Sequence, residues 1–230
     1  MQSKSLSITV LRCPGCGNDL DGLSTDIIFF CTECGRCLVS GDKLAPVEIE
    51  FTRHDDSGTI LLPFWKVDAT VDILSRITRS ESRAIPIAGK REFHGGNLDL
   101  VESFIASRRD LIIFPAFSTS LVLSTGVKLN EEEFSQEPLQ HGKYPPMIGG
   151  NVGLEDASKL ASGVAVGIEV WKSDYLAFID LDIEVHSAKV LAIGCTPSES
   201  AFRINGTNID IPFEAVKDAD DILKRSGYNS

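Results

Sequence analysis

Cys13-Pro-Gly-Cys16 and Cys31-Thr-Glu-Cys34 are the two stretches that decide how the N-terminal part of this chain folds. In each stretch a two-residue spacer turns the backbone so that two sulfurs point toward one place. Fourteen residues separate the two pairs, and together they supply the four thiolates that a tetrahedral Zn²⁺ ion prefers. The spacing predicts one metal site with the ligands Cys13, Cys16, Cys31 and Cys34, which leave no position for water or substrate.

Short strand-like stretches surround these two turns. Residues 9–12 and 27–30 lead into the cysteine pairs, and residues 37–40 lead away from the second. Gly17 and Gly35 directly follow the pairs. A positive φ at these glycines would let backbone N–H groups face the sulfurs and stabilise thiolate charge. We therefore expect a small β-module built around the ion.

Over roughly residues 11–46 this arrangement resembles the zinc ribbon, with rubredoxin-like knuckles. The resemblance implies one structural zinc ion per chain and is silent on activity. A rubredoxin surrounds its iron with several aromatic residues, whereas the loop between the pairs here offers only Phe29 and Phe30. Zinc is therefore favoured over iron. We expect a ribbon over residues 1–47 and a second domain over residues 48–230.

Composition and charge limit the classes of function. The 230 residues are 43% hydrophobic and 24% charged, with a formal net charge of −11. These proportions are typical of a soluble globular protein with room for a metal-bound module and one larger core. The negative charge disfavours contact with phosphate backbones and anionic membranes unless basic residues gather locally.

Targeting signals and cysteine usage indicate the compartment. The first ten residues have no long apolar core, and no apolar run approaches the roughly 20 residues of a membrane span. Five of the six cysteines lie within 25 residues of one another. Such clustering favours metal binding in a reducing compartment over a disulfide framework. We therefore expect a cytoplasmic protein without a membrane span.

Two further cysteines lie outside the predicted site. Cys37 extends the second pair to a run that superficially evokes an iron–sulfur cluster, but a fourth ligand followed by proline is missing. We interpret Cys37 as an inward-facing residue of the strand that leaves the second knuckle. Cys195 has no histidine nearby in sequence, which favours a buried packing residue over a nucleophile.

Residues 48–230 indicate an α+β fold with a mostly antiparallel sheet and three or four helices. Strands are expected at 48–52, 59–74, 110–114, 165–171, 175–186, 188–194, 202–204 and 208–211. Helices are expected at 97–107, 118–129, 155–163 and 214–225. Short connections at 171–175, 186–188 and 205–206 favour antiparallel pairing, and Asn205-Gly206 is a strong hairpin signal.

Residues 59–74 form the clearest strand. Its alternation predicts one buried face, made of Trp65, Val67, Ala69, Val71 and Ile73. The opposite, largely solvated face is made of Phe64, Lys66, Asp68, Thr70 and Asp72. A faint echo links residues 61–69 with 175–183. It indicates either an internal duplication or two similar strands of one antiparallel sheet.

Alternating acidic residues make a second candidate site. Asp180, Asp182, Glu184 and His186 fall on one face of a predicted strand. One hypothesis is a metal-dependent enzyme that uses these side chains for cation binding or acid–base chemistry. The favoured interpretation is a solvated face whose opposite side is buried.

A basic segment makes a third candidate. Residues 76–91 contain five basic side chains against Glu81 alone, a net charge of +4. The five are Arg76, Arg79, Arg83, Lys90 and Arg91. They could contact phosphate or an acidic partner. No aromatic residue interleaves with them, so a base-stacking surface is poorly supported and a solvated loop is favoured.

The balance of charge on the ribbon guides the functional hypothesis. Between residues 10 and 46, three basic residues stand against five acidic ones, a net charge of −2 before any metal binds. A ribbon that grips phosphate presents more Arg and Lys than this. The leading hypothesis is a non-enzymatic protein-docking adaptor or accessory subunit with a protein partner. A nucleic-acid-associated factor and a metal-dependent enzyme are the alternatives.

Overall fold

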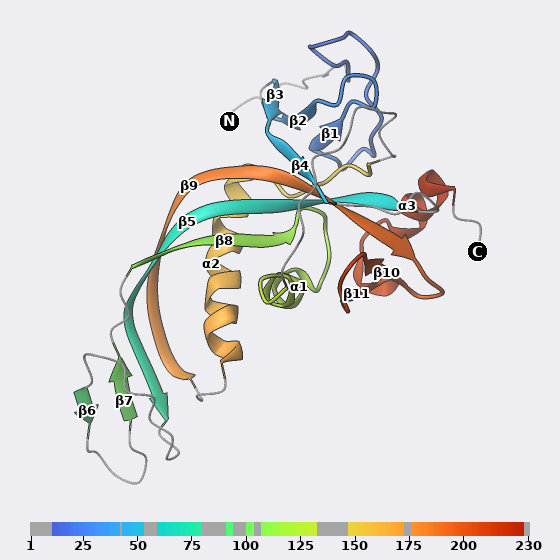
Figure 1. Cartoon of the computed structure of the whole chain (residues 1–230). Coiled ribbons are helices and arrows are strands. Elements are labelled where there is room, and N and C mark those ends of the chain that lie inside the picture. The colour runs from blue at the N-terminus through green and yellow to red at the C-terminus, as the bar shows by residue number, and fades with distance from the viewer. Residues whose placement is uncertain are drawn as a thin grey trace, which may run out of the picture.

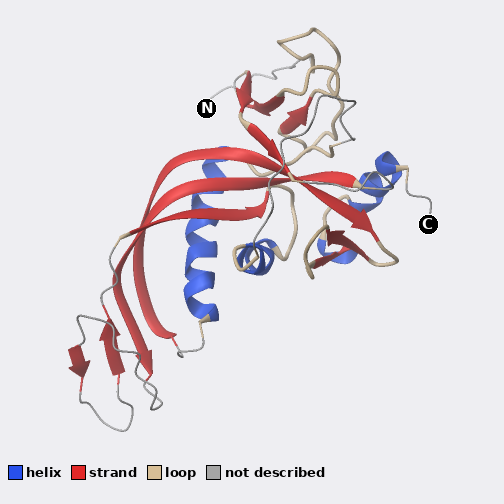
Figure 2. Ribbon diagram, viewed as in Figure 1, coloured by secondary structure: helices blue, strands red, loops and turns tan. Residues whose placement is uncertain are grey.

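The computed structural model describes residues 11–41, 43–52, 59–79, 91–93, 100–103, 107–132, 147–172 and 176–227. Over these residues the predicted α+β class is confirmed, with a small sheet beside the cysteines and a large, mostly antiparallel sheet that carries the helices. Figures 1 and 2 show the small sheet above the arch formed by the long strands, which continue past it.

The small sheet is antiparallel throughout. Its strands β1 (Ile28–Phe30), β2 (Cys37–Ser40) and β3 (Leu44–Val47) pair in the order β1-β2-β3. The predicted lead-in at residues 27–30 and lead-out at 37–40 therefore form the first hairpin. The predicted lead-in at 9–12 falls partly outside the described residues, and Arg12 makes an isolated bridge to Asp19.

The large sheet has eight strands in the described part of the chain, ordered β11-β10-β9-β5-β7-β6, with β4 beside β9 and β8 beside β5. Among the strand pairs that the structure describes, only that of β4 with β9 is parallel. The strands are β4 (Ile49–Phe51), β5 (Ile60–Arg79), β6 (Arg91–Phe93), β7 (Leu100–Ser103), β8 (Arg108–Pro115), β9 (Leu176–Pro197), β10 (Ala201–Ile204) and β11 (Asp210–Pro212).

The antiparallel pair of β5 and β9 is the longest feature of the fold. The two strands have 20 and 22 residues and pair from Ile60 opposite Cys195 to Thr78 opposite Leu176. The prediction of separate strands at 175–186 and 188–194 is therefore wrong. A bulge explains the error, because Ser187 lies opposite Asp68 and Val185 opposite Ala69, and His186 is the extra residue. Its broken alternation looks like a turn in the sequence.

Three such register shifts curve the pair around a helix. They leave Leu74, Ala177 and His186 as extra residues. At each shift two consecutive side chains lie on the outer face of the sheet, which we define as the face away from α2 (Leu154–Trp171). Extra residues bend a strand, and here they lengthen the outer face. The strands consequently arch over α2, which lies inside the curve (Figure 1).

Helix α2 overturns another prediction. The expected strand at 165–171 is wrong, because α2 continues from the predicted helix through Trp171. Gly163 does not end the helix but allows close contact with α1 (Val122–Leu129). A Cβ atom at Gly163 would lie 3.0 Å from Leu123 Cδ2, and one at Gly167 would lie 2.6 Å from Val127 Cγ2. The glycines are therefore packing residues, which sequence alone does not distinguish from a helix stop.

The remaining predicted elements have mixed outcomes. The helix expected at 97–107 is wrong where it can be compared, because residues 100–103 form β7, while 97–99 and 104–106 lie outside the described residues. The helix expected at 118–129 is confirmed but begins later, at Val122. The C-terminal helix is divided into a 3₁₀ turn (Phe213–Ala215) and α3 (Ala219–Ser226), separated at Asp218 with φ +62°. The hairpin at Asn205-Gly206 is confirmed.

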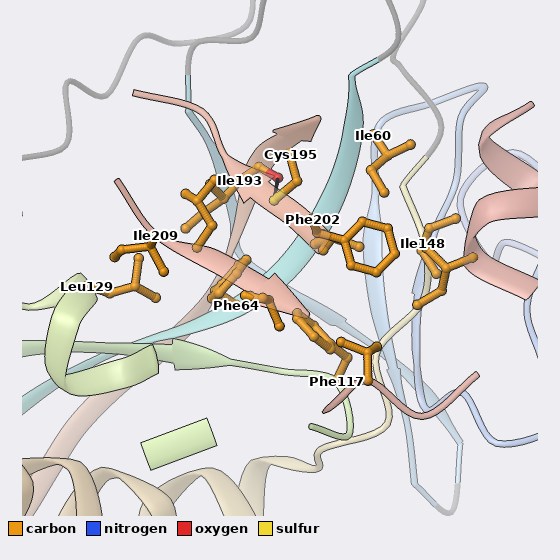
Figure 3. Packing of buried hydrophobic residues seen from close by; sticks show 14 of the residues in the cluster. Ile60, Phe64, Phe117, Leu129, Ile148, Ile193, Cys195, Phe202 and Ile209 are labelled. Carbon is orange, nitrogen blue, oxygen red and sulfur yellow. Dashed lines mark hydrogen bonds between the residues drawn. The ribbon is translucent and has the colours of Figure 1, made fainter. Parts of the chain in front are cut away.

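Two apolar clusters hold the large sheet. One lies between the arch and α2 and contains Trp65, Val67 and Val164. The other gathers at the opposite end of β5 and β9, where Figure 3 shows Phe64 and Phe117 at one side of the cluster and Cys195 at the other. The face of residues 59–74 predicted to be solvated is therefore only partly so. Phe64 is buried in the second cluster and Lys66 is buried in an ion pair with Glu50, whereas Asp68, Thr70 and Asp72 are half-exposed.

The ribbon shares its core with the large sheet. Ile28, Phe30 and Cys37 belong to the cluster that contains Trp65. The backbone N–H groups of Ile27 and Ile28 both donate to Gly150 O, at 2.7 and 2.8 Å. These contacts fix β1, which leads directly into the second cysteine pair, on the body. The domain division at residue 47 and the internal duplication both stay predictions.

Membrane insertion by a helix finds no support in this architecture. Among the described helices, none combines the length and apolar character needed to cross a bilayer.

A buried ion cluster joins the far end of α2 to the sheet. The Glu169 side chain is fully buried and accepts hydrogen bonds from Arg76 Nε at 3.0 Å, Arg108 Nη1 at 2.8 Å and Lys172 Nζ at 2.6 Å. Burial alone would raise the pKa of Glu169, but the charges and hydrogen bonds of Lys172 and Arg108 lower it. Arg76 is itself buried, so the two charges depend on each other.

Replacing Glu169 by glutamine should therefore destabilise the protein strongly. Glu169→Gln removes the buried carboxylate charge that Arg76 Nε and Arg108 Nη1 contact, and we expect a loss of about 3 kcal/mol in the free energy of unfolding. Urea unfolding followed by circular dichroism measures it. The matched control is Glu155→Gln. The Glu155 carboxylate pairs with Lys159 in an exposed helical turn, so this substitution should reduce the free energy of unfolding by less than about 0.5 kcal/mol. Equal effects of the two variants would contradict the assignment.

Candidate metal centre

The two cysteine pairs lie in two separate backbone turns of the same kind. Cys13 N donates to Asn18 O and Gly17 N donates to Cys13 O, both at 2.8 Å. In the second knuckle Cys31 N donates to Arg36 O and Gly35 N to Cys31 O, again at 2.8 Å. The glycines have φ of +78° and +72°, a conformation that other residues adopt only with strain. The predicted positive φ at both glycines is therefore confirmed.

The four sulfurs gather at one point. The Sγ atoms of Cys13, Cys16, Cys31 and Cys34 all lie within 4.8 Å of one another. The Cys13–Cys34 and Cys16–Cys31 Sγ separations are both 3.5 Å. Sulfurs at about 2.3 Å from a tetrahedral zinc ion are about 3.8 Å apart. The donor set and its spacing thus fit a Zn²⁺ ion that receives all its ligands from the protein.

The two knuckles contribute one buried and one exposed sulfur each. Cys13 and Cys31 are buried, whereas Cys16 and Cys34 are exposed. The inner pair belongs to a small apolar cluster with Leu20, Phe29 and Leu38. The site is consequently anchored by packing on one side and lies at the protein surface on the other.

The protein favours a thiolate at one of these positions before any metal binds. Burial would raise the pKa of Cys13, but the N–H groups of Gly15 and Cys16 and the thiols of Cys34 and Cys16 lower it to about 6. Burial instead raises the pKa of Cys34 to about 12, with further contributions from the neighbouring thiols. Metal binding must displace protons from such neighbours, so metal affinity should depend on pH.

Arg36 places a positive charge against the first knuckle, which sequence reasoning did not predict. A Cβ atom added to Gly15 would lie 2.2 Å from Arg36 Nη1, so the guanidinium lies directly against the first knuckle. Four thiolates around Zn²⁺ would carry a net charge of about −2, which a guanidinium at this knuckle would offset in part. The signal available in the sequence was a basic residue two positions after Cys34 together with a glycine inside the first pair.

The other two cysteines lie apart from this group. Cys37 is 1% exposed, and burial raises its pKa to about 12. Cys195 is fully buried in the cluster around Phe64, where its thiol faces Ile193 O at 3.6 Å and burial raises its pKa. The predictions that both are inward-packing residues are confirmed.

The acidic strand does not form a compact site. Asp180, Asp182, Glu184 and His186 are exposed along the outer face of β9. Within the described residues, only the four cysteines bring three or more ligand atoms of this kind close enough for one ion. His186 Nε2 instead lies 2.6 Å from Thr70 Oγ1. The solvated acidic face is confirmed, whereas the side chains of the opposite face, Ile179, Leu181, Ile183 and Val185, are half-buried rather than buried.

One arginine of the basic segment is buried in the protein interior. Arg76 is 2% exposed and bound to Glu169, so it takes no part in a surface patch. Residues 75–79 belong to β5, and the expectation of a loop there is wrong. Arg83 and Lys90 lie outside the described residues, as do the side chains of Arg79 and Arg91.

Asp26 marks the junction between ribbon and body, and sequence reasoning overlooked it. Its carboxylate is buried and accepts a hydrogen bond from Leu23 N at 2.7 Å. A Cβ atom at Gly149 would lie 2.4 Å from Asp26 Oδ2, so this glycine makes room for the carboxylate. Burial is the main factor that raises the pKa of Asp26, while the charge of Arg225 lowers it.

Metal analysis should find one zinc ion per chain. Cys16→Ser removes a thiolate and should reduce zinc content well below one, because three sulfurs hold the ion more weakly. Cys37→Ala should retain one zinc. Inductively coupled plasma mass spectrometry of protein purified under reducing conditions measures both, and acidification should release the metal as the thiolates become protonated. Equal zinc loss in the two variants would argue against the assigned ligand set.

Asp26→Asn should change how stability depends on pH. The folded protein holds this proton more tightly than the unfolded chain does, so the free energy of unfolding falls as pH rises from the ordinary value of 3.8 through the folded pKa. We expect Asp26→Asn to remove that fall and to be more stable than wild type at pH 7.5. Chemical unfolding from pH 3.5 to 8 tests this, with the exposed Asp19→Asn as the control that keeps the wild-type slope.

No family model, no curated protein and no solved structure matches this chain. The cysteine cluster is therefore the feature that indicates a metal-binding protein, and its geometry supports a zinc-ribbon-like site.

Proposed function

We propose that this chain is a non-enzymatic zinc-ribbon protein that acts as a protein-docking adaptor or accessory subunit of a larger assembly. The observation that carries the proposal is the closed donor set. Four sulfurs within 4.8 Å of one another would fill every position around a tetrahedral ion, so the ion would shape the ribbon and offer no place to a substrate. The ligands are Cys13, Cys16, Cys31 and Cys34.

The position of the knuckles supports a docking role. Pro14 and Gly15 at the first tip, and Thr32 and Glu33 at the second, are all exposed. Below them, Ile28 and Phe30 anchor the ribbon in the core of the body. A rigid, exposed tip on a fixed base is suited to contact another protein, because little conformational freedom is lost on binding.

Metal binding would couple the order of the two knuckles to docking. The strands beneath them are packed into the body, whereas the exposed knuckle tips would be linked to each other by the ion. All six cysteines are free thiols, which suits a reducing compartment such as the cytoplasm. The nucleic-acid alternative is less favoured, because Arg76 is withdrawn from the basic segment.

Charge reversal at the second knuckle tests the docking role. The tagged full-length chain, purified from its own cells under native conditions, should retain a partner protein in a fixed ratio. Glu33→Lys should reduce that partner at least tenfold, and Glu131→Lys, a matched reversal at an exposed site after α1, should leave it unchanged. Quantitative mass spectrometry measures the ratio. Migration of the wild-type chain in native lysate as a free 25.0 kDa species would overturn the proposal.

A further inference from the structure

One edge of β9 is without a neighbouring strand over most of its length in the described structure. Strand β5 pairs with β9 along one side. On the other side β4 covers residues 190–192 and β10 covers 195–197. From residue 176 to 189, no described strand pairs with this second side. Figure 1 shows β9 as the rim of the arch over this stretch.

An uncovered edge of this length is unusual, because its free N–H and C=O groups can pair with another chain. Bulges interrupt β9 at Ala177 and His186, but the eight residues 178–185 between them alternate regularly. This segment contains no proline, and no charged residue of it faces α2. It therefore lacks two features, proline and inward-facing charge, that commonly prevent an edge strand from pairing with another chain.

The inner side chains of this segment are incompletely covered. Ile179, Leu181, Ile183 and Val185 pack against the cluster beneath the arch, yet each remains only half-buried. A strand added at the edge would place its own inward side chains beside them, because neighbouring strands bring side chains of one face to about 5 Å. Apolar residues at those positions would extend the existing cluster.

The outer side chains of the same segment require the opposite chemistry. Asp180, Asp182 and Glu184 are exposed, and Asp72 of β5 lies directly opposite Asp182. None of these four carboxylates forms an ion pair with a residue that the structure describes. Like charges that face each other across strands are destabilising. An added strand that carries Lys or Arg on its outer face would relieve this repulsion.

We propose that residues 178–185 of β9 bind an extended segment of a partner protein as an added strand, and that this segment alternates apolar residues with Lys or Arg. A second copy of this chain fits poorly, because two β9 edges would bring their carboxylates together in a protein of net charge −11. Backbone pairing would supply affinity, and the alternation would supply specificity. This inference rests on the proposed docking function and names a surface and partner chemistry for it.

A synthetic peptide tests the proposal directly on the full-length zinc-loaded chain. The labelled, end-blocked peptide Thr-Lys-Val-Lys-Val-Lys-Val-Thr should bind at least tenfold more tightly than Thr-Lys-Lys-Lys-Val-Val-Val-Thr, measured by fluorescence anisotropy at about 150 mM salt. The two peptides have the same charge and composition, so only the alternation differs. Equal binding of the two peptides would overturn the proposal.

Backbone methylation separates strand addition from simple charge attraction. Only every second residue of an added strand bonds to its neighbour. Of two peptides N-methylated at either the lysines or the valines, one should lose binding at least tenfold and the other should retain it. Binding should also slow amide hydrogen exchange within residues 178–185. Retention of binding by both methylated peptides would show a purely electrostatic surface and overturn the proposal.

Matched charge reversals test the location. Asp182→Lys with Glu184→Lys should weaken peptide binding at least tenfold, whereas Glu131→Lys with Glu132→Lys, the same change of charge on exposed residues elsewhere, should leave it within threefold. If both double variants weakened peptide binding equally, the assignment of the binding site to residues 178–185 would be overturned.

The state of the edge before peptide is added gives an independent check. A dimer of the free chain in sedimentation, lost in the Asp182→Lys/Glu184→Lys variant, would overturn the partner assignment. Slow exchange throughout residues 178–185 without peptide would show an edge already covered and would also overturn it. Partner retention that depends on Glu33 is measured separately, so failure of the peptide alone removes this inference and leaves the docking proposal standing.

Discussion

The antiparallel pairing of β5 with β9 is the interaction on which the rest of this structure depends. Every other strand of the large sheet attaches to this pair directly or through one neighbour. The ribbon reaches it through Ile28 and Phe30, which share a cluster with Trp65 of β5. At the far end, where apolar packing against α2 gives out, Glu169 and Arg76 continue the contact as a buried ion pair. The helices and the ribbon are thus held in place by the paired strands β5 and β9.

The ribbon combines two ways of stabilising a small sheet. Its lower half is held by side chains inserted into the body, and its upper half is organised for four sulfurs around one point. Asp26 lies at the boundary, where a buried carboxylate faces Gly149. Metal binding would therefore act mainly on the exposed knuckles, while the strands beneath them would remain attached to the core. The expected adaptor surface is the part that depends most on the ion.

Local chemistry was predictable from the sequence, and long-range geometry was not. The cysteine turns and the Asn205-Gly206 hairpin follow from residues only a few positions apart, and both predictions of local structure are confirmed. The split of β9 into two strands was wrong because a bulge at His186 and a turn break alternation in the same way. Gly163 was misread as the end of a helix, because the side chain that requires a glycine there, Leu123, lies on another helix. Arg36 and Asp26 were missed since their partners are brought near only by folding.

The three bulges also determine which residues the strands present to each side. On β9, odd-numbered residues from 179 to 185 face α2, but even-numbered ones do so from 188 to 192, and the change occurs at His186. Loss of that one residue would invert the parity of the strand on one side of it. Asp180, Asp182 and Glu184 would then turn beneath the arch, and four aliphatic side chains would turn to water. The arch should accordingly tolerate many changes of residue type but very few changes of length.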